Sequence, residues 1–243
     1  MFDLFSPQHP FRLWSPAVQS GAGGPTTITW DFTGSPDALY QDTAGVMPAG
    51  EADTVASIAH PLYPMQQSEA ARRPILGTAD DSGTFEDAGD QLFCEAIAAV
   101  IDAVMEAGQD LLINVAFNAP SITNSPILFS IATNLDTGRW YMQVLSNGRI
   151  RVQMTSNENA LLAAYNHGVT VITPGVTYTM GVLLSGGKIT VLVDDIPIAQ
   201  DESFPLTGKD FTVQHVVMNG LRLIGTGRDG MIGGKIFSVQ LVF

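Results

Sequence analysis

The sequence feature that most constrains the fold is a pair of alternating segments around Asn147-Gly148, in the stretch RWYMQVLSNGRIRVQM from residue 139 to residue 154. Asn-Gly accepts the positive φ angles that a type I′ turn requires, and alternating segments on either side of such a turn form a β-hairpin. With Asn147 and Gly148 as a two-residue loop, Leu145 is expected opposite Ile150, and Tyr141 opposite Met154. The chain is therefore expected to be built on an antiparallel sheet.

This register gives the hairpin one apolar face, and its second strand also has a clean polar face. The apolar face is expected to hold Tyr141, Leu145, Ile150, Val152 and Met154, while Arg149, Arg151 and Gln153 point the other way. Such a division is typical of a sandwich sheet with one solvent-exposed face. In the same register Trp140, Met142 and Val144 fall on the polar face, so either another segment covers them or a bulge shifts the register.

The composition favours an all-β chain with many turns. Among 243 residues, 45% are apolar and 14% charged, with 24 Gly and 14 Pro. These values suit short strands joined by tight turns and argue against disorder. We expect one antiparallel two-sheet jelly-roll sandwich over residues 28–243, with one short helix, and an extended N-terminal arm over residues 1–27.

Charge and cysteine usage exclude several classes of function. The net charge is −13 with only 11 Lys plus Arg, which leaves no basic stripe for nucleic acid and would repel anionic lipid. No segment has the length for membrane insertion, and the first residues show no signal peptide. Cys94 is alone, so it forms no intrachain disulfide and is expected to be a buried hydrophobe.

The first 27 residues differ from the rest of the chain. Large apolar side chains alternate with Pro7, Pro10 and Pro16, so neither helix nor strand periodicity fits. Such a segment is expected to dock either on its own sandwich or on a neighbouring subunit. The candidate docking residues are Phe2, Leu4, Phe5, Phe11, Leu13 and Trp14.

Alternation and helical spacing predict the elements that follow. The expected strands are 26–32, 111–117, 127–133, 160–171, 177–184, 188–193, 218–224 and 235–243. Apolar residues at helical spacing predict a helix over 94–105, with Gly108 near its end. Gly186-Gly187 predicts a second hairpin turn.

The order of these pieces resembles a known arrangement. DALYQDTAGVMPA (37–49), EAARRPIL (69–76), FEDAGDQLF (85–93), the short helix, the hairpins and the final GGKIFSVQLVF resemble concanavalin A-like, laminin-G-like jelly rolls, and more narrowly those of tailed-phage structural proteins. The resemblance covers about residues 37–243. It implies two antiparallel sheets with a concave face, on a fold that hosts lectins, adhesion modules, glucanases and particle scaffolds alike.

Catalytic patterns are sought and not found. Glucanases of this fold carry Glu-x-Asp-x-x-Glu on one strand, but here Ala56 stands where Glu51 and Asp53 would require the second Glu. The histidines show no metal-ligand spacing. We therefore expect no enzyme and no cofactor. Calcium, which is common among laminin-G relatives, stays an alternative because Asn134, Asp136 and Asp229 are loop oxygens of the right kind.

Exposed aromatics beside amides are the side chains that would recognise a glycan. The candidates are Trp140, Tyr141, Tyr165, Asn166 and His167, and the alternative for each is packing within the sheets. Trp140 stands out because the predicted register turns it away from the core.

Two functions follow. The first is a non-enzymatic virion protein of a tailed phage, made in the host cytoplasm, displayed on head or tail, bound to other virion proteins through the arm, and a homo-oligomer. The alternative is an adhesin module that binds host-surface glycans through the concave face or the loops.

Overall fold

The structure is a computed structural model that describes residues 26–32, 39–40, 53–55, 63, 65–67, 72, 74, 83–133, 137–206, 209–220 and 229–243. The candidate docking residues of the arm, from Phe2 to Trp14, lie outside these ranges, as do Asn134 and Asp136. The predicted arm therefore stays a prediction.

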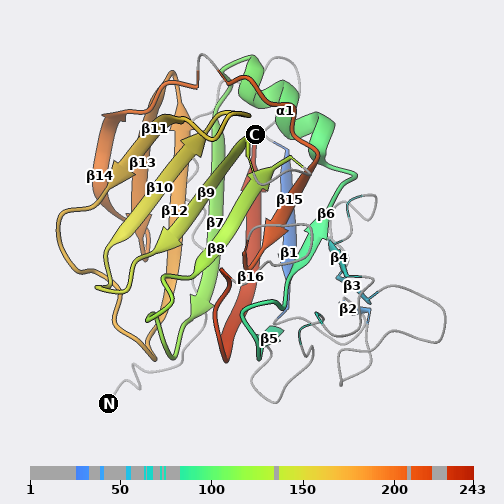
Figure 1. Cartoon of the computed structure of the whole chain (residues 1–243), viewed down its shortest axis with the longest axis vertical. Coiled ribbons are helices and arrows are strands. Elements are labelled where there is room, and N and C mark those ends of the chain that lie inside the picture. The colour runs from blue at the N-terminus through green and yellow to red at the C-terminus, as the bar shows by residue number, and fades with distance from the viewer. Residues whose placement is uncertain are drawn as a thin grey trace, which may run out of the picture.

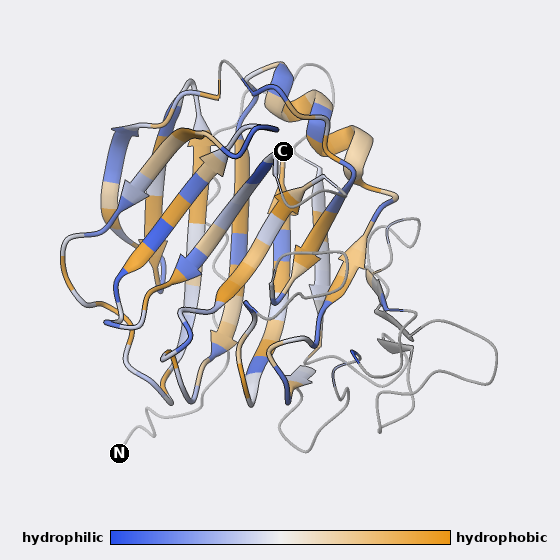
Figure 2. Ribbon diagram, viewed as in Figure 1, coloured by the Kyte–Doolittle hydropathy of each residue, from blue (hydrophilic) through white to orange (hydrophobic). Residues whose placement is uncertain are grey.

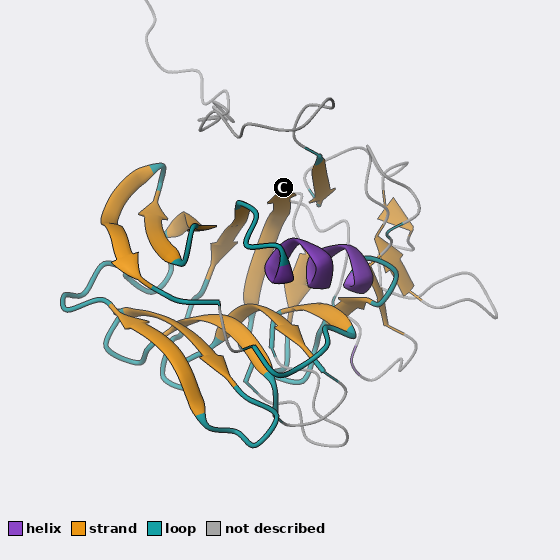
Figure 3. Ribbon diagram, turned by 90° about the horizontal axis from the view of Figure 1, so that it is seen from above, coloured by secondary structure: helices purple, strands orange, loops and turns teal. Residues whose placement is uncertain are grey.

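Two antiparallel sheets pack face to face, as Figures 1 and 3 show. Within the described residues the first sheet has seven strands. Its order is β1 (Thr27–Asp31), β16 (Gly234–Val242), β7 (Leu111–Asn118), β12 (Thr177–Ser185), β13 (Lys188–Val193) and β14 (Ile196–Ser203), with β5 (Gly83–Phe85) also paired to β16. The predicted all-β jelly-roll sandwich is confirmed.

The second sheet has nine strands in the same part of the chain. Its order is β11 (Leu161–Asn166), β10 (Ile150–Thr155), β9 (Arg139–Val144), β8 (Ile127–Ala132), β15 (His215–Met218), β6 (Leu92–Cys94), β4 (Met65–Gln67), β3 (Asp53–Val55) and β2 (Leu39–Tyr40). We call the face of this sheet that points away from the seven-stranded sheet its outer face.

Strict alternation places the core between the sheets. In β7, Leu111, Ile113, Val115 and Phe117 are buried, while the residues between them are half-buried. The bands of alternating hydropathy along the strands in Figure 2 follow the same period of two. Trp30 also lies in the core, and its Nε1 donates to the carbonyl oxygen of Tyr63 at 2.7 Å.

In the part of the chain that the structure describes, one helix, α1 (Ala98–Glu106), lies against the sandwich. Ile101, Val104 and Met105 point into the core, and Gly108 follows the helix with a φ of +62°, as the sequence predicts for a helix end. Asp102 ties the helix to the loop between β14 and β15, because its carboxylate accepts hydrogen bonds from Lys209 Nζ at 2.7 Å and Val213 N at 2.8 Å.

The central hairpin forms, but its register differs from the prediction by one residue. Val144 pairs with Ile150, Met142 with Val152, and Trp140 with Met154. The loop has three residues, 146–148, with Gly148 at a φ of +74°, rather than the two of a type I′ turn.

A slip of one residue exchanges the two faces of a strand. Trp140, Met142 and Val144 therefore face the core, and Tyr141 faces outward. Their predicted placement was wrong, and the register shift that the sequence analysis left as an alternative is the explanation.

The bounds of several other strands differ from those predicted. The predicted strand 218–224 begins where β15 (His215–Met218) ends, and its residues 221–224 lie outside the described ranges. The predicted strand 160–171 is shortened to β11. β14 follows β13 through Asp194 and Asp195, which both have positive φ and form a turn that the sequence analysis did not predict. None of the helical structure in the described ranges has the length and apolarity of a membrane-crossing segment.

Candidate functional site

The outer face of β9, β10 and β11 carries a compact set of polar side chains. Their pairing across the strands sets them in rows: Gln143, Arg151 and Asn166 form one row, and Tyr141 and Gln153 lie in the next. Arg139 comes before Tyr141 on the same face of β9. We call these six residues the arginine face: Arg139, Tyr141, Gln143, Arg151, Gln153 and Asn166.

Hydrogen bonds hold several of these side chains in place. Arg151 Nε donates to Asn166 Oδ1 at 2.8 Å, and Gln143 Nε2 donates to the carbonyl oxygen of Ser125 at 2.7 Å. The Arg139 guanidinium carbon lies 6.0 Å from the centre of the Tyr141 ring, within the range of a cation–π contact. The face is thus organised before any ligand arrives.

Tyr141 is the buried centre of this face, with 7% of its surface exposed. Burial raises the pKa of its hydroxyl, while Arg139 and Arg151, the latter also through a hydrogen bond, act in the opposite direction, and Asp229 adds to the rise. The phenol is therefore neutral at physiological pH. Its role in the face is to hold the two guanidinium groups rather than to offer an open aromatic ring.

The rest of the outer face, over β8 and β15, is covered. Ser130, Val217 and His215 all have 0% exposure although their strand positions face outward. Ser130 Oγ donates to the carbonyl oxygen of Gly220 at 2.8 Å, and Ile127 N to that of Asp229 at 2.6 Å. Gly220 and Asp229 therefore lie against this part of the sheet, and they bound the half-exposed arginine face on that side.

The predicted glycan-binding residues separate into three groups. Tyr141 and Asn166 belong to the arginine face. Trp140 is fully buried in the core, so the prediction that it is exposed was wrong. The hairpin loop is one residue longer than assumed, and the side chain consequently points inward.

Tyr165 and His167 form the third group, at the end of β11. Tyr165 is half-buried and packs against the core, and its hydroxyl lies 2.7 Å from His167 Nδ1. Burial raises the pKa of Tyr165, and Glu202 adds to the rise. These two residues thus bond to each other near the open edge between β11 and β14, and of the pair only Tyr165 reaches the core.

The described ranges contain no candidate metal site: no group of three or more His, Cys, Asp and Glu side chains there could hold an ion. Of the candidate calcium ligands only Asp229 is described, and its backbone carbonyl is used by Ile127. The alternative of calcium stays untested.

Sequence reasoning missed the two arginines as binding candidates because it looked for aromatic residues. A signal was present: Arg139, Arg149 and Arg151 are three of the chain's 11 lysines and arginines, and they fall within one hairpin. Arg151 and Gln153 were predicted to point away from the core, and the structure confirms this.

No family model matches the chain, and no curated protein matches it in sequence. Its fold is similar to that of a Trypanosoma rangeli sialidase in complex with 2,3-difluoro-KDN, with a TM-score of 0.58 and 12% identity over 88% of this chain and 30% of that one. The likeness is one of fold.

Two further similar structures have lower scores. The CBM40 module of a Ruminococcus gnavus IT-sialidase, bound to α2,3-sialyllactose, has a TM-score of 0.47 and 14% identity over 57% of this chain and 78% of that one. A botulinum neurotoxin type C structure, described by its interaction with two ganglioside molecules, has a TM-score of 0.45 and 10% identity over 62% of this chain and 36% of that one. The narrower resemblance to phage proteins is not tested by these structures.

Proposed function

We propose that this chain is a glycan-binding module that recognises an acidic sugar through the arginine face. The observation that carries the proposal is the grouping of Arg139 and Arg151 with the amides of Gln143, Gln153 and Asn166 on one half-exposed surface. This is the predicted alternative of a carbohydrate-binding adhesin, with a different set of contact residues.

The chemistry of the face suits a sugar that carries a carboxylate. A guanidinium group can donate two parallel hydrogen bonds to a carboxylate, and such charge-assisted bonds are stronger than neutral ones. Side-chain amides both donate and accept, so they match the hydroxyl and acetamido groups around a sugar ring.

The negative net charge of the chain sets the two guanidinium groups of the arginine face apart from the rest of the surface. With a net charge of −13, most of this surface repels an anionic ligand at long range, whereas two guanidinium groups on adjacent strands attract it locally. The T. rangeli sialidase of similar fold is in complex with a nononic sugar acid, so sialylated glycans are the natural first probes.

Binding of 3′-sialyllactose and lactose, measured by isothermal titration calorimetry, tests the proposal. We expect 3′-sialyllactose to bind more tightly than lactose, and Arg151→Ala to weaken sialyllactose binding about 10-fold or more, because a hydrogen bond to a charged group contributes about 1.5–3 kcal/mol. Lys188→Ala is the matched control, since Lys188 is an exposed cation on β13 of the other sheet.

Two results would contradict the proposal. One is unchanged affinity of the Arg151→Ala protein. The other is a glycan array, including sialylated, uronic and sulfated sugars, on which the folded protein binds no acidic glycan.

The predicted display on a tailed-phage particle, with other virion proteins as partners and a homo-oligomeric state, rests on the sequence resemblance over residues 37–243. Glycan recognition and particle display are compatible roles. Deletion of residues 1–25 tests the second: it should abolish incorporation into particles while the sandwich stays folded, and full incorporation of the shortened protein would count against it.

A further inference from the structure

A cleft of about 520 Å³ lies at the end of the sandwich where three loops meet. The loop from β7 to β8 and the loop from β11 to β12 both cross between the two sheets there, and the turn of the β9–β10 hairpin lies beside them. Ligand sites in proteins have volumes of about 300–1,000 Å³ and often occupy such loop clusters. We call this space the loop cleft.

The walls of the loop cleft are fixed by hydrogen bonds between the loops. The carbonyl oxygen of Gly148 accepts from both Val171 N at 3.0 Å and Ile172 N at 2.9 Å, and Thr170 Oγ1 donates to the carbonyl oxygen of Asn147 at 2.8 Å. Across the cleft, Gly175 N donates to the carbonyl oxygen of Ala119 at 2.8 Å. A ligand would therefore enter a preformed site and order little of the chain on binding.

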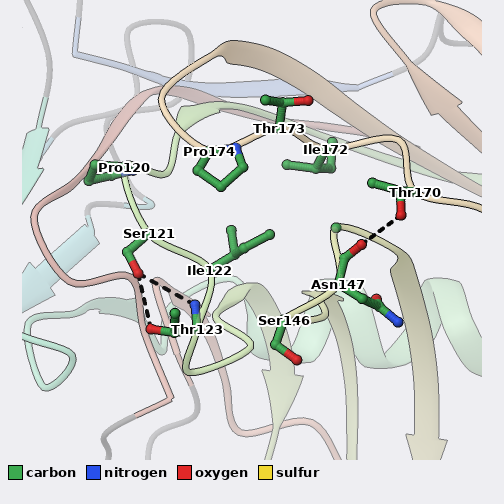
Figure 4. Close-up of a pocket in the computed structure, with 11 residues that line it drawn as sticks. Pro120, Ser121, Ile122, Thr123, Ser146, Asn147, Thr170, Ile172, Thr173 and Pro174 are labelled. Atoms are coloured by element: carbon green, nitrogen blue, oxygen red, sulfur yellow. Dashed lines mark hydrogen bonds between the residues drawn. The ribbon is translucent and has the colours of Figure 1, made fainter.

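The lining combines aliphatic carbon with neutral polar groups. Ile122 and Ile172 belong to the core and form the apolar part of the cleft together with Pro120 and Pro174. The polar lining residues are Ser121, Thr123, Ser146, Asn147, Thr170 and Thr173. Figure 4 shows Ser121 hydrogen-bonded to Thr123 and Thr170 hydrogen-bonded to Asn147.

Among the described residues, none that lines the loop cleft is charged, although the chain has 24 Asp plus Glu and 11 Lys plus Arg. An anion or cation would lose its hydration here without gaining a partner of opposite charge, which is unfavourable. A neutral polyhydroxylated ring is the better match, because its C–H face can contact the prolines and isoleucines while its hydroxyl groups bond to the surrounding side chains.

We propose that the loop cleft is a binding site for one uncharged sugar unit, separate from the arginine face. The two sites are chemically distinct, and a neutral sugar in the loop cleft does not require that the arginine face bind anything. Asn147 lies in the turn between β9, which carries Arg139, and β10, which carries Arg151, so the hairpin of the arginine face also forms one wall of the cleft.

Titration of the full ¹⁵N-labelled chain with lactose, followed by NMR, tests this site. We expect fast-exchange shifts that saturate at millimolar lactose and are confined to amides around Ser121, Asn147 and Thr173. Thr123→Trp and Thr173→Trp place a large ring in the cleft from opposite walls, and each should remove the shifts. Thr212→Trp is the matched control, because Thr212 is an exposed threonine between β14 and β15 that does not line the cleft.

Shifts elsewhere on the protein, no shifts at 50 mM lactose (about the limit of a weak site), or full binding by both folded cleft variants would overturn the proposal. Arg151→Ala separates this inference from the proposed function, since it should leave the lactose shifts unchanged while it weakens sialyllactose. Loss of both in that variant would show that the two sites are not independent, and would also count against it.

Discussion

Trp140 lies directly opposite Met154 across the β9–β10 hairpin, and both side chains are completely buried between the sheets. This pairing fixes the orientation of every other residue in the hairpin. Because Trp140 points inward, its neighbours Arg139 and Tyr141 point outward, and Tyr141 lies directly opposite Gln153 of the next strand. The arginine face therefore depends on a three-residue turn that begins six residues after Trp140, about 20 Å along an extended strand.

Removal of the Trp140 side chain should destabilise the protein strongly. Trp140→Ala creates a large cavity in the core, and such substitutions cost about 3–5 kcal/mol of unfolding free energy. Gln153→Ala on the outer face of the paired strand is the control and should change stability by less than about 0.5 kcal/mol. Urea denaturation followed by tryptophan fluorescence of other sites, or by circular dichroism, measures both. Equal stability of the two variants would show that the register is wrong.

Gly148 and Gly175 allow the effect of backbone conformation to be separated from that of packing. Both have positive φ, +74° and +79°, but a Cβ at Gly148 would overlap the carbonyl oxygen of Ile172, whereas nothing lies within 4 Å of one at Gly175. Gly175→Ala should cost about 1 kcal/mol from backbone strain alone, and Gly148→Ala more, because the turn must also move away from residues 170–172. Denaturant midpoints of the two variants check this order, and the reverse order would contradict it.

Asp90 should make a pH-dependent contribution to stability of unusual sign for a carboxyl group. Burial raises its pKa above 3.8, despite hydrogen bonds from the backbone of Asp87 and Glu86 that act in the opposite direction. The folded state thus holds the proton more tightly than the unfolded chain, so the stability from this group is full below pH 3.8 and falls as the pH rises through the raised pKa.

Asp90→Asn removes this titration while it keeps an oxygen that can accept from Asp87 N, 3.0 Å from the carboxylate. The difference in unfolding free energy between the two proteins should therefore shift in favour of the asparagine variant as the pH rises from 3.5 to 7 (a range that spans the ordinary carboxyl pKa of about 3.9). Thermal unfolding across that range measures the difference. A difference that does not change with pH would refute the assignment.

Cys94 should react slowly with thiol reagents in the folded protein. Its side chain is 1% exposed, and burial raises the pKa of the thiol to about 11, so thiolate is scarce at neutral pH. A thiol-reactive dye at pH 7.5 should label the native protein over hours and the urea-unfolded protein within minutes (roughly neutral pH leaves an ordinary thiol of pKa about 8.5 partly ionised). Rapid labelling without denaturant would show that β6 opens readily.

Local patterns in the sequence predicted most of the sandwich. Alternation in β7 and β12, the glycine pair between β12 and β13, and the helical spacing before Gly108 each depend on interactions within a few residues, so they can be seen without the fold. β16 was found by the same means, although a bulge between Ile236 and Ser238 changes which of its residues share a face.

The candidate sites could not be predicted in the same way. The arginine face needs β9, β10 and β11 in one register, and the loop cleft needs residues 120–123, 146–148 and 170–174 to meet at one end of the sandwich. No local pattern specifies the loop cleft, because its residues are far apart along the chain. The arginine face lies mostly within one hairpin, but its outward orientation depends on a register that the local pattern predicted one residue out.

The sequence by itself determined that this chain alternates into antiparallel sheets with a buried apolar layer, because the period of two is a property of each strand. Only the tertiary structure decided which side of the hairpin faces the core. The energy of burying Trp140, Met142 and Val144 against the opposite sheet outweighs the preference of Asn-Gly for a two-residue turn, and that balance depends on partners that lie elsewhere in the chain.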